Sequence, residues 1–92
     1  MVEQRVVITN RLGLHARAAA QLVRMASRFQ SFVRLERADG TATADAKSIL
    51  SVLMLAASRG TELRATAEGV DAAEAVNAVC RLIADGFGES DR

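Results

Sequence analysis

The sequence predicts a two-layer α/β (α+β) domain in which helices cover one face of a mostly antiparallel sheet. Two observations lead to this prediction. Some stretches are β-branched or alternate between apolar and polar residues, which predicts strands, and others are amphipathic with a helical period. Along the chain they follow the order β-α-β-β-α-β-α. The 92 residues contain no linker, internal repeat or low-complexity tract. We therefore expect a single domain over residues 1–92.

The first strand and helix are indicated by a change of period. The β-branched stretch RVVIT, residues 5–9, is bounded by Asn10 and predicts a strand. From Ala16 to Arg28 apolar residues recur at three-four spacing, which predicts an amphipathic helix. Its apolar positions are Ala19, Leu22, Val23 and Ala26, and its polar face carries Arg17, Gln21, Arg24 and Arg28.

A β-hairpin is expected next. FVRLER, residues 32–37, alternates and predicts a strand with Val33 and Leu35 inward. ADG, residues 38–40, is a turn signal, and TATA, residues 41–44, would return as a weakly apolar strand.

The remaining elements are a short helix, a strand and a long helix. SILSVLMLAAS, residues 48–58, predicts the short helix, and TELRATA, residues 61–67, alternates as a strand does. Asp71 is expected to cap the last helix, with Glu74 completing a capping box, and Gly86 to end it. The expected apolar face of this helix consists of Val76, Val79, Cys80, Ile83 and Phe87.

The composition is that of an ordinary soluble globular protein. Half of the residues are hydrophobic, a quarter are charged and the net charge is +1, which implies no strong attraction to nucleic acid or membrane. Cys80 is the one cysteine, so no internal disulfide can form, and with one histidine no zinc site can be built. There is no signal-peptide pattern and no apolar run of ~18 residues. We expect a cytoplasmic protein without metal or cofactor.

The one histidine, His15, stands at a loop-to-helix junction in NRLGLHARAAA and is the main candidate for chemistry. Such a histidine is by itself more often a cap or a surface residue, but three features favour a reactive role. The helix N-terminus offers free N–H groups and the positive end of its dipole to an anion. Arg17 can hold phosphate oxygens bidentately, and Gly13 permits a sharp turn or close backbone approach. The helix N-terminus and the guanidinium both favour a neutral, nucleophilic ring.

The segment DAKSILSVLML, residues 45–55, is too apolar to bury as one helix. Seven of the eight residues from Ile49 to Ala56 are apolar, so a partner surface is the preferred interpretation. The alternative is that Val52 and Leu55 face the core and the others are exposed incidentally. Ser48 stands where a helix N-cap belongs, and capping is the role that the sequence favours for it.

Two motifs, GLHARAAA after the first strand and AKSILSVLML at the second helix, occur together with the predicted element order. They resemble HPr, the family of histidine-containing phosphocarriers of the bacterial phosphoenolpyruvate-dependent sugar phosphotransferase system, from Val2 to Phe87. The resemblance implies an open-faced β-sandwich of four antiparallel strands and three helices. It also implies that His15 accepts a phosphoryl group on Nδ1 from phosphorylated enzyme I and donates it to a histidine of enzyme IIA. Such a chain is a carrier that enzymes act on, and not itself an enzyme.

The resemblance also implies roles for other residues. Arg17 matches the family's phosphate-contacting arginine, and the backbone N–H groups of Ala16 and Arg17 match its anion-binding amides. Ser48 matches the serine that HPr kinase/phosphorylase phosphorylates from ATP in organisms that have that enzyme. The positions where the family docks its partners are occupied by Arg24, Lys47, Ile49, Leu50, Leu53 and Met54. A carrier that meets several partners is expected to be a monomer.

Two departures from the family pattern stand out. Ala18 replaces the usual proline after the arginine, which leaves the helix able to form but its entry less rigid. The hairpin through residues 38–45 is slightly longer than usual.

Other functions remain as alternatives. Within the family, the chain could serve a regulatory, nitrogen-related phosphotransferase branch, and its enzyme IIA partner would distinguish the two. A binding module without phosphotransfer is a further alternative. A nucleic-acid-binding domain would need aromatic platforms or a basic stripe, which Phe29, Phe32 and Phe87 do not provide. A self-contained enzyme is disfavoured because no second general base, metal cluster or glycine-rich nucleotide loop accompanies His15.

Overall fold

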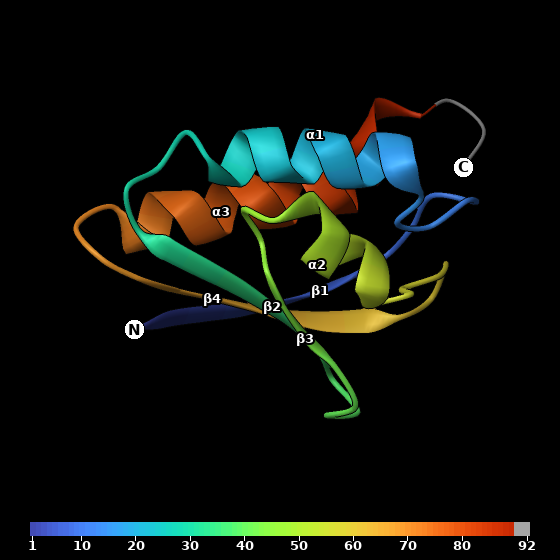
Figure 1. The fold of residues 1–92 in the computed structure, drawn as a ribbon, viewed down its shortest axis with the longest axis horizontal. Helices are drawn as coiled ribbons and strands as arrows, with labels where there is room; N and C mark the ends of the chain where they lie inside the picture. Colours follow the sequence, from blue (N-terminus) through green and yellow to red (C-terminus); the bar gives the residue numbers. More distant parts are fainter. Residues whose placement is uncertain (90–92) are drawn as a thin grey trace.

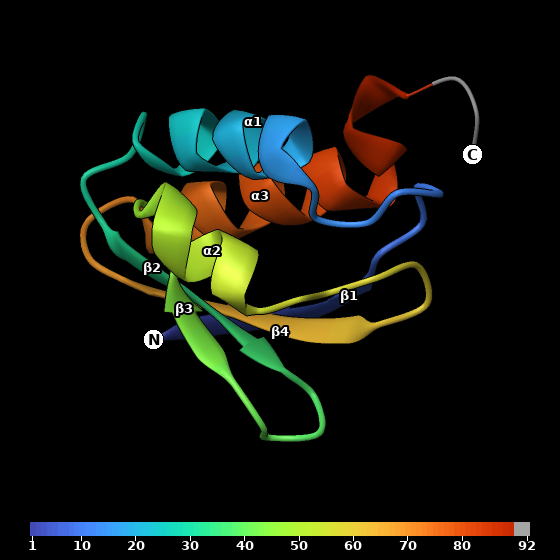
Figure 2. The ribbon, with the colours of Figure 1, turned by 45° about the vertical axis from the view of Figure 1, so that its right-hand side comes forward.

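The computed structural model describes residues 1–89, and in this part three helices pack on one face of a four-stranded antiparallel sheet (Figures 1 and 2). The elements are β1 (Val2–Val7), α1 (Ala16–Ala26), β2 (Phe32–Arg37), β3 (Thr43–Asp45), α2 (Ile49–Met54), β4 (Glu62–Glu68), α3 (Ala72–Ala84) and the short 3-10 turn η1 (Gly86–Gly88). The predicted fold class and element order are confirmed. Residues 90–92 of the expected domain lie outside the described part.

The strands lie in the order β1-β4-β2-β3, so β4, the last of the four strands in the sequence, pairs with both β1 and β2. The register places inward residues opposite one another: Val33 pairs with Ala67, and Leu35 with Ala65. The same register continues into the hairpin, where Leu35 pairs with Ala44. The alternation of buried and exposed residues in these strands follows because successive side chains point to opposite faces.

Several element bounds differ from the sequence prediction: α1 ends at Ala26 and not at Arg28, β4 is shifted by one residue to 62–68, and three further elements differ as follows. β1 begins at Val2 and ends at Val7 instead of running to Thr9, although Ile8 still pairs with Thr61 and Gly60 through backbone hydrogen bonds of 2.9 Å. β3 is displaced to 43–45 because the turn occupies more of the hairpin. α2 ends at Met54, well before Ser58, since Ala56 adopts a left-handed conformation (φ 52°) that no helix accommodates.

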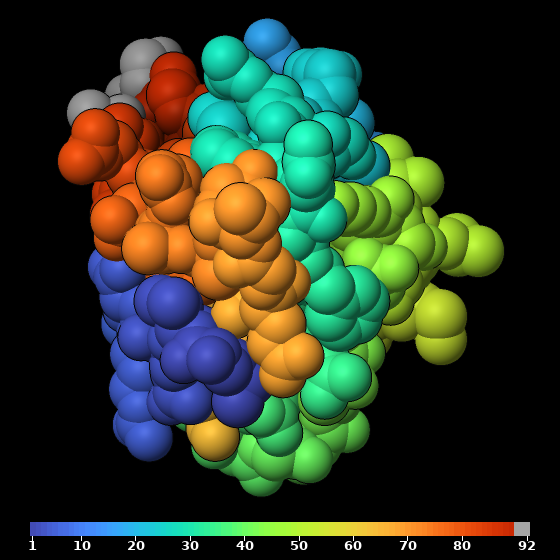
Figure 3. Space-filling model, turned by 90° about the vertical axis from the view of Figure 1, so that its left-hand side faces the viewer, coloured from blue at the N-terminus to red at the C-terminus, as the bar shows by residue number. Residues whose placement is uncertain are grey.

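The predicted capping box at the start of α3 is wrong. Asp71 is the N-cap residue, but its carboxylate accepts hydrogen bonds from the loop before β2 instead of from its own helix. The donors are the backbone N–H of Ser31 (2.9 Å), the Ser31 hydroxyl and the backbone N–H of Gln30 (3.0 Å). These bonds, that of the Ser31 hydroxyl foremost, hold the pKa of Asp71 below its ordinary value. Figure 3 shows the two segments, teal and orange, lying against each other.

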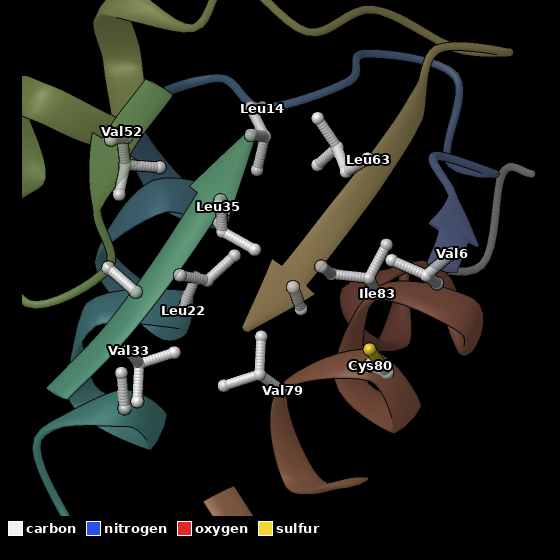
Figure 4. Packing of buried hydrophobic residues seen from close by; sticks show 14 of the residues in the cluster. Val6, Leu14, Leu22, Val33, Leu35, Val52, Leu63, Val79, Cys80 and Ile83 are labelled. Carbon is white, nitrogen blue, oxygen red and sulfur yellow. The ribbon is translucent and has the colours of Figure 1, made fainter. Parts of the chain in front are cut away.

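The core lies between the sheet and the helices and is almost entirely aliphatic (Figure 4). Four residues of the predicted α3 face, Val76, Val79, Cys80 and Ile83, are buried there. Phe87 is buried too, but the prediction that it lies on the helix is wrong, because α3 ends at Ala84. Burial raises the pKa of the Cys80 thiol to about 11, which supports the interpretation of Cys80 as an inert core residue.

Candidate functional site

His15 is the residue immediately before α1. Its backbone is extended (φ −77°, ψ 177°), and its carbonyl accepts the first helical hydrogen bond, from the N–H of Ala19 at 2.8 Å. The imidazole makes no capping bond to the helix, and the first turn contains no acidic residue. The N–H groups of Ala16 and Arg17 therefore have no partner within the helix and are available to an anion.

Gly13 allows the loop before His15 to approach the segment after α2. It has φ +67°, and a Cβ atom there would lie 2.6 Å from the carbonyl oxygen of Ala57 and 2.8 Å from the Cα of Ser58. The N–H of Leu14 donates to that same carbonyl at 2.9 Å. Both reasons proposed for the glycine, a sharp turn and a close approach, are present.

Ala18 takes the place of the family's proline without disturbing the start of the helix. α1 begins at Ala16, and the side chain of Ala18 is fully buried in its first turn. Packing against the core thus fixes the helix entry that a proline ring would otherwise stiffen.

His15 and Arg17 border the same open depression, of about 340 Å³. Its other lining residues are Leu12, Gln21, Phe87, Gly88 and Glu89. Arg17 is exposed and lies one helical position beyond the free amide of Ala16. The structure therefore places Arg17 at the same opening as the imidazole, whereas Ala16 is not among the residues that line it.

Two residues that the sequence analysis did not identify also belong to this site. The Glu89 carboxylate oxygen Oε2 lies 2.6 Å from Nε2 of His15, and its Oε1 accepts a hydrogen bond of 3.1 Å from Nδ2 of Asn10. Asn10 is fully buried, and its Nδ2 also donates to the carbonyl of Gly13 at 2.8 Å. The carboxylate opposes the field of the helix N-terminus at the ring, an effect absent from the sequence-based argument.

The apolar helix α2 divides between core and solvent. Val52 and the following Leu55 are buried, whereas Ile49, Leu50 and Met54 are 43%, 68% and 76% exposed. Leu53 is half-buried against the core. The burial of Val52 and Leu55 is consistent both with a partner surface and with incidental exposure of the other residues. The adjoining exposed side chains form an apolar surface.

The polar residues predicted around α2 have defined environments. The Ser48 hydroxyl accepts from the N–H of Ser51 at 3.4 Å, so its role as N-cap of α2 is confirmed. The Lys47 ammonium donates to the carbonyl of Phe29 at 2.8 Å. Arg24 is exposed in the last turn of α1, which packs beside α2.

Within residues 1–89, no three His, Cys, Asp or Glu side chains come together in a group that could hold a metal ion. None of the helices in this part of the chain is long and apolar enough to cross a membrane.

Known proteins resemble the chain throughout its length. The family model described as "PTS HPr component phosphorylation site" matches residues 2–85. Phosphocarrier protein HPr of Cupriavidus necator is 43% identical over 99% of this chain and 100% of its own length, and phosphocarrier protein NPr of Proteus mirabilis is 41% identical over 94% of each. The crystal structure of HPr from Thermoanaerobacter tengcongensis superposes with a TM-score of 0.90, at 40% identity, covering 98% of this chain and 99% of that one. The chain therefore belongs to the HPr family of phosphocarrier proteins of the phosphotransferase system.

Proposed function

We propose that the chain carries the phosphoryl group on Nδ1 of His15, receiving it from phosphorylated enzyme I and passing it to a histidine of enzyme IIA. The main observation in support is the start of α1, where the partly exposed imidazole and Arg17 border one depression, the first turn carries no acidic residue and the first N–H groups have no partner within the helix. These groups match what a phosphoryl dianion needs on arrival. The chain acts in this scheme as a substrate of its partner enzymes and needs no cofactor.

The strength of this site suits a carrier. A charge at a helix end contributes roughly 0.3–1 kcal/mol, and an arginine hydrogen bond to phosphate about 1.5–3 kcal/mol. Each ~1.4 kcal/mol changes an equilibrium tenfold. An enclosed site with more donors would hold the phosphoryl group too firmly to pass it on, whereas the depression around His15 is open to solvent and to a partner.

The exposed apolar side chains of α2 are proposed as the centre of the docking surface for both partners. Ile49, Leu50 and Met54 supply exposed apolar area, with Leu53 at its edge. Arg24 and Lys47 add positive charge, which favours an acidic partner. The segment after α2 contacts the loop that carries His15, so a protein bound on α2 lies near the ring. A monomer in the cytoplasm leaves this surface free.

Ser48 is proposed as a second, regulatory phosphorylation site, for HPr kinase/phosphorylase where the cell contains it. Its hydroxyl is partly exposed and caps α2, next to the exposed Ile49. A phosphate there adds about two negative charges beside the apolar docking surface. The expected consequence is weaker binding of enzyme I, measured by titrating Ser48→Asp against the wild type.

The NPr relative supports a second candidate function, phosphoryl transfer in a regulatory branch of the same system. Its 41% identity is close to that of the HPr relatives, so overall similarity favours neither branch. Incubating the phosphorylated chain with enzyme IIA proteins of both kinds from the source organism distinguishes them, since the cognate partner accepts the group faster.

Intact-mass analysis tests the main proposal. The wild type and His15→Ala are incubated with phosphoenolpyruvate and the source organism's enzyme I. We expect one acid-labile phosphoryl adduct on the wild type and none on the variant. An enzyme I that phosphorylates another carrier but leaves the wild type unmodified would contradict the proposal.

A further inference from the structure

The contact between Glu89 and His15 is close and partly shielded from water. The two side chains are 15% and 27% exposed, and Oε2 lies 2.6 Å from Nε2. Shielding from solvent strengthens such a hydrogen bond relative to an exposed ion pair. Glu89 lies beyond residues 2–85, the part that matches the family model.

The chain after α3 is folded so as to bring Glu89 to the ring. Gly86, Phe87 and Gly88 all have positive φ (67°, 58° and 72°), and Phe87 is buried as an anchor. The N–H of Glu89 donates to the carbonyl of Gly86 at 3.0 Å. In Figures 1 and 2 this red segment lies beside the blue first turn of α1. The position of Glu89 is thus fixed by its backbone hydrogen bond to Gly86, and its carboxylate by the hydrogen bond that Oε1 accepts from the buried Asn10.

A carboxylate at this place determines which ring nitrogen carries the proton. An ionised carboxylate only accepts hydrogen bonds, so the contact requires a proton on Nε2. A neutral imidazole has one N–H, and its other nitrogen, here Nδ1, then keeps its lone pair. Nδ1 is the nitrogen on which the proposed function places the phosphoryl group.

We propose that Glu89 is a positioning residue for phosphoryl transfer, which retains the proton on Nε2 and presents the Nδ1 lone pair to the donor. This inference rests on the proposed function of His15. In the transfer, the Nδ1 lone pair forms the new N–P bond, and the donor's N–P bond breaks with its electron pair remaining on the donor nitrogen. Nε2 keeps its proton throughout. The phosphorylated ring is therefore positively charged beside Glu89, and it becomes neutral again when the group departs.

Two variants of Glu89 and one control separate this role from a general charge effect. Glu89→Ala removes the carboxylate. Glu89→Gln retains the shape, but its amide offers one oxygen where Nε2–H and Asn10 Nδ2 both donate, so one of the two bonds is lost. Asp85→Asn removes an exposed negative charge four residues earlier, at the end of α3, and leaves the ring contact intact.

The ring is examined by nitrogen-15 NMR, and the transfer by steady-state kinetics with enzyme I. In the neutral wild-type ring we expect Nε2 to carry the proton and Nδ1 to be unprotonated. Both Glu89 variants should shift the two resonances toward a mixture of tautomers. They should lower kcat about tenfold with KM for the carrier unchanged, as loss of an orienting hydrogen bond does. Asp85→Asn should match the wild type in both measurements.

Three results overturn the inference. The first is that both Glu89 variants show the same kcat and the same ring resonances as the wild type, while His15 of the wild type is phosphorylated normally. The proposed function then stands, and the proposed role of Glu89 fails. The second is an equal loss of kcat in Asp85→Asn, which would show a charge effect only. The third is a wild type that is not phosphorylated on His15, in which case both proposals fail together, whatever the NMR shows of the contact.

Discussion

The N-termini of α1 and α3 differ in the charged residues around them, although neither N-cap side chain forms a hydrogen bond to its own helix. At α3, Asp71 provides a carboxylate that binds the Gln30–Ser31 loop, and Glu74 stands in the first turn. The negative charge that a helix N-terminus attracts is therefore built into the chain. At α1 there is no acidic residue in the first turn, and Arg17 lies there instead.

This difference shows how one helix end supports the fold while another stays available. The start of α3 joins two distant segments through Asp71, and its negative charge would repel an anion. The start of α1 is placed by its loop, through Gly13 and Leu14, and not by a cap. In the proposed function its amides receive the phosphoryl group, whereas the Glu89 carboxylate at this helix start contacts the His15 ring. Substitutions at the two helix starts therefore test this contrast.

Adding a methyl group at either junction should destabilise the protein strongly. Gly13→Ala meets the Ala57 carbonyl at 2.6 Å, and Gly69→Ala, before α3, meets the Ser31 hydroxyl at 2.5 Å and Ser31 Cα at 2.7 Å; both glycines have positive φ. We expect losses of about 3 kcal/mol each in urea unfolding. Gly40→Ala is the control, because it has positive φ but open space around it, and should cost about 1 kcal/mol.

The two destabilised variants should differ in function. At a temperature where both are folded, Gly13→Ala should accept phosphate from enzyme I more slowly, since the loop before His15 shifts. Gly69→Ala should keep the wild-type rate. Equal rates in the two variants would mean that the His15 loop needs no such placement.

Arg17 is expected to matter for transfer and not for folding. Arg17→Ala should slow phosphorylation by roughly 10–100-fold, the equivalent of one or two charged hydrogen bonds to phosphate. The phosphorylation rate of Arg17→Lys should lie between that of Arg17→Ala and that of the wild type, because lysine keeps the positive charge but lacks the planar guanidinium. The control is Arg28→Ala, an exposed arginine after α1. Stopped-flow assays with enzyme I measure the rates, and an equal loss in both alanine variants would indicate charge steering alone.

Asp71 should make stability depend on pH at the other helix end. Its folded pKa is lowered by the hydrogen bonds from Ser31 and Gln30. Its stabilising effect is therefore complete above the ordinary aspartate pKa and is lost as pH falls through the folded value. Asp71→Asn should lower Tm by on the order of 5 °C at neutral pH and less in acid. Thermal unfolding at several pH values measures this; a constant difference would contradict the assignment.

The sequence predicted the features of the fold and the site that depend on residues close together in the chain. Alternation in residues 32–37 and helical spacing in 16–26 are local patterns, and His15 with Arg17 can be recognised because both lie at one helix start. Glu89 could not be found in this way, since it is 74 positions from His15 and reaches it through three residues of positive φ. The capping box at Asp71 failed for a related reason: Ser31, 40 positions away, competes for the carboxylate.

The smallest expected effect is also the most direct test of the contrast. Ala16→Glu places an acid on the exposed first residue of α1 and so makes this end resemble that of α3. Stability should rise by about 0.3–1 kcal/mol through the helix dipole, while phosphorylation slows because the new carboxylate repels the incoming phosphate. Glu74→Gln, the reverse change at α3, should lower stability by about the same 0.3–1 kcal/mol and leave phosphorylation unchanged. Urea unfolding and the enzyme I assay measure both. Phosphorylation at the wild-type rate in Ala16→Glu would show that the anion does not bind at the start of α1, because a carboxylate there should affect stability and transfer in opposite directions.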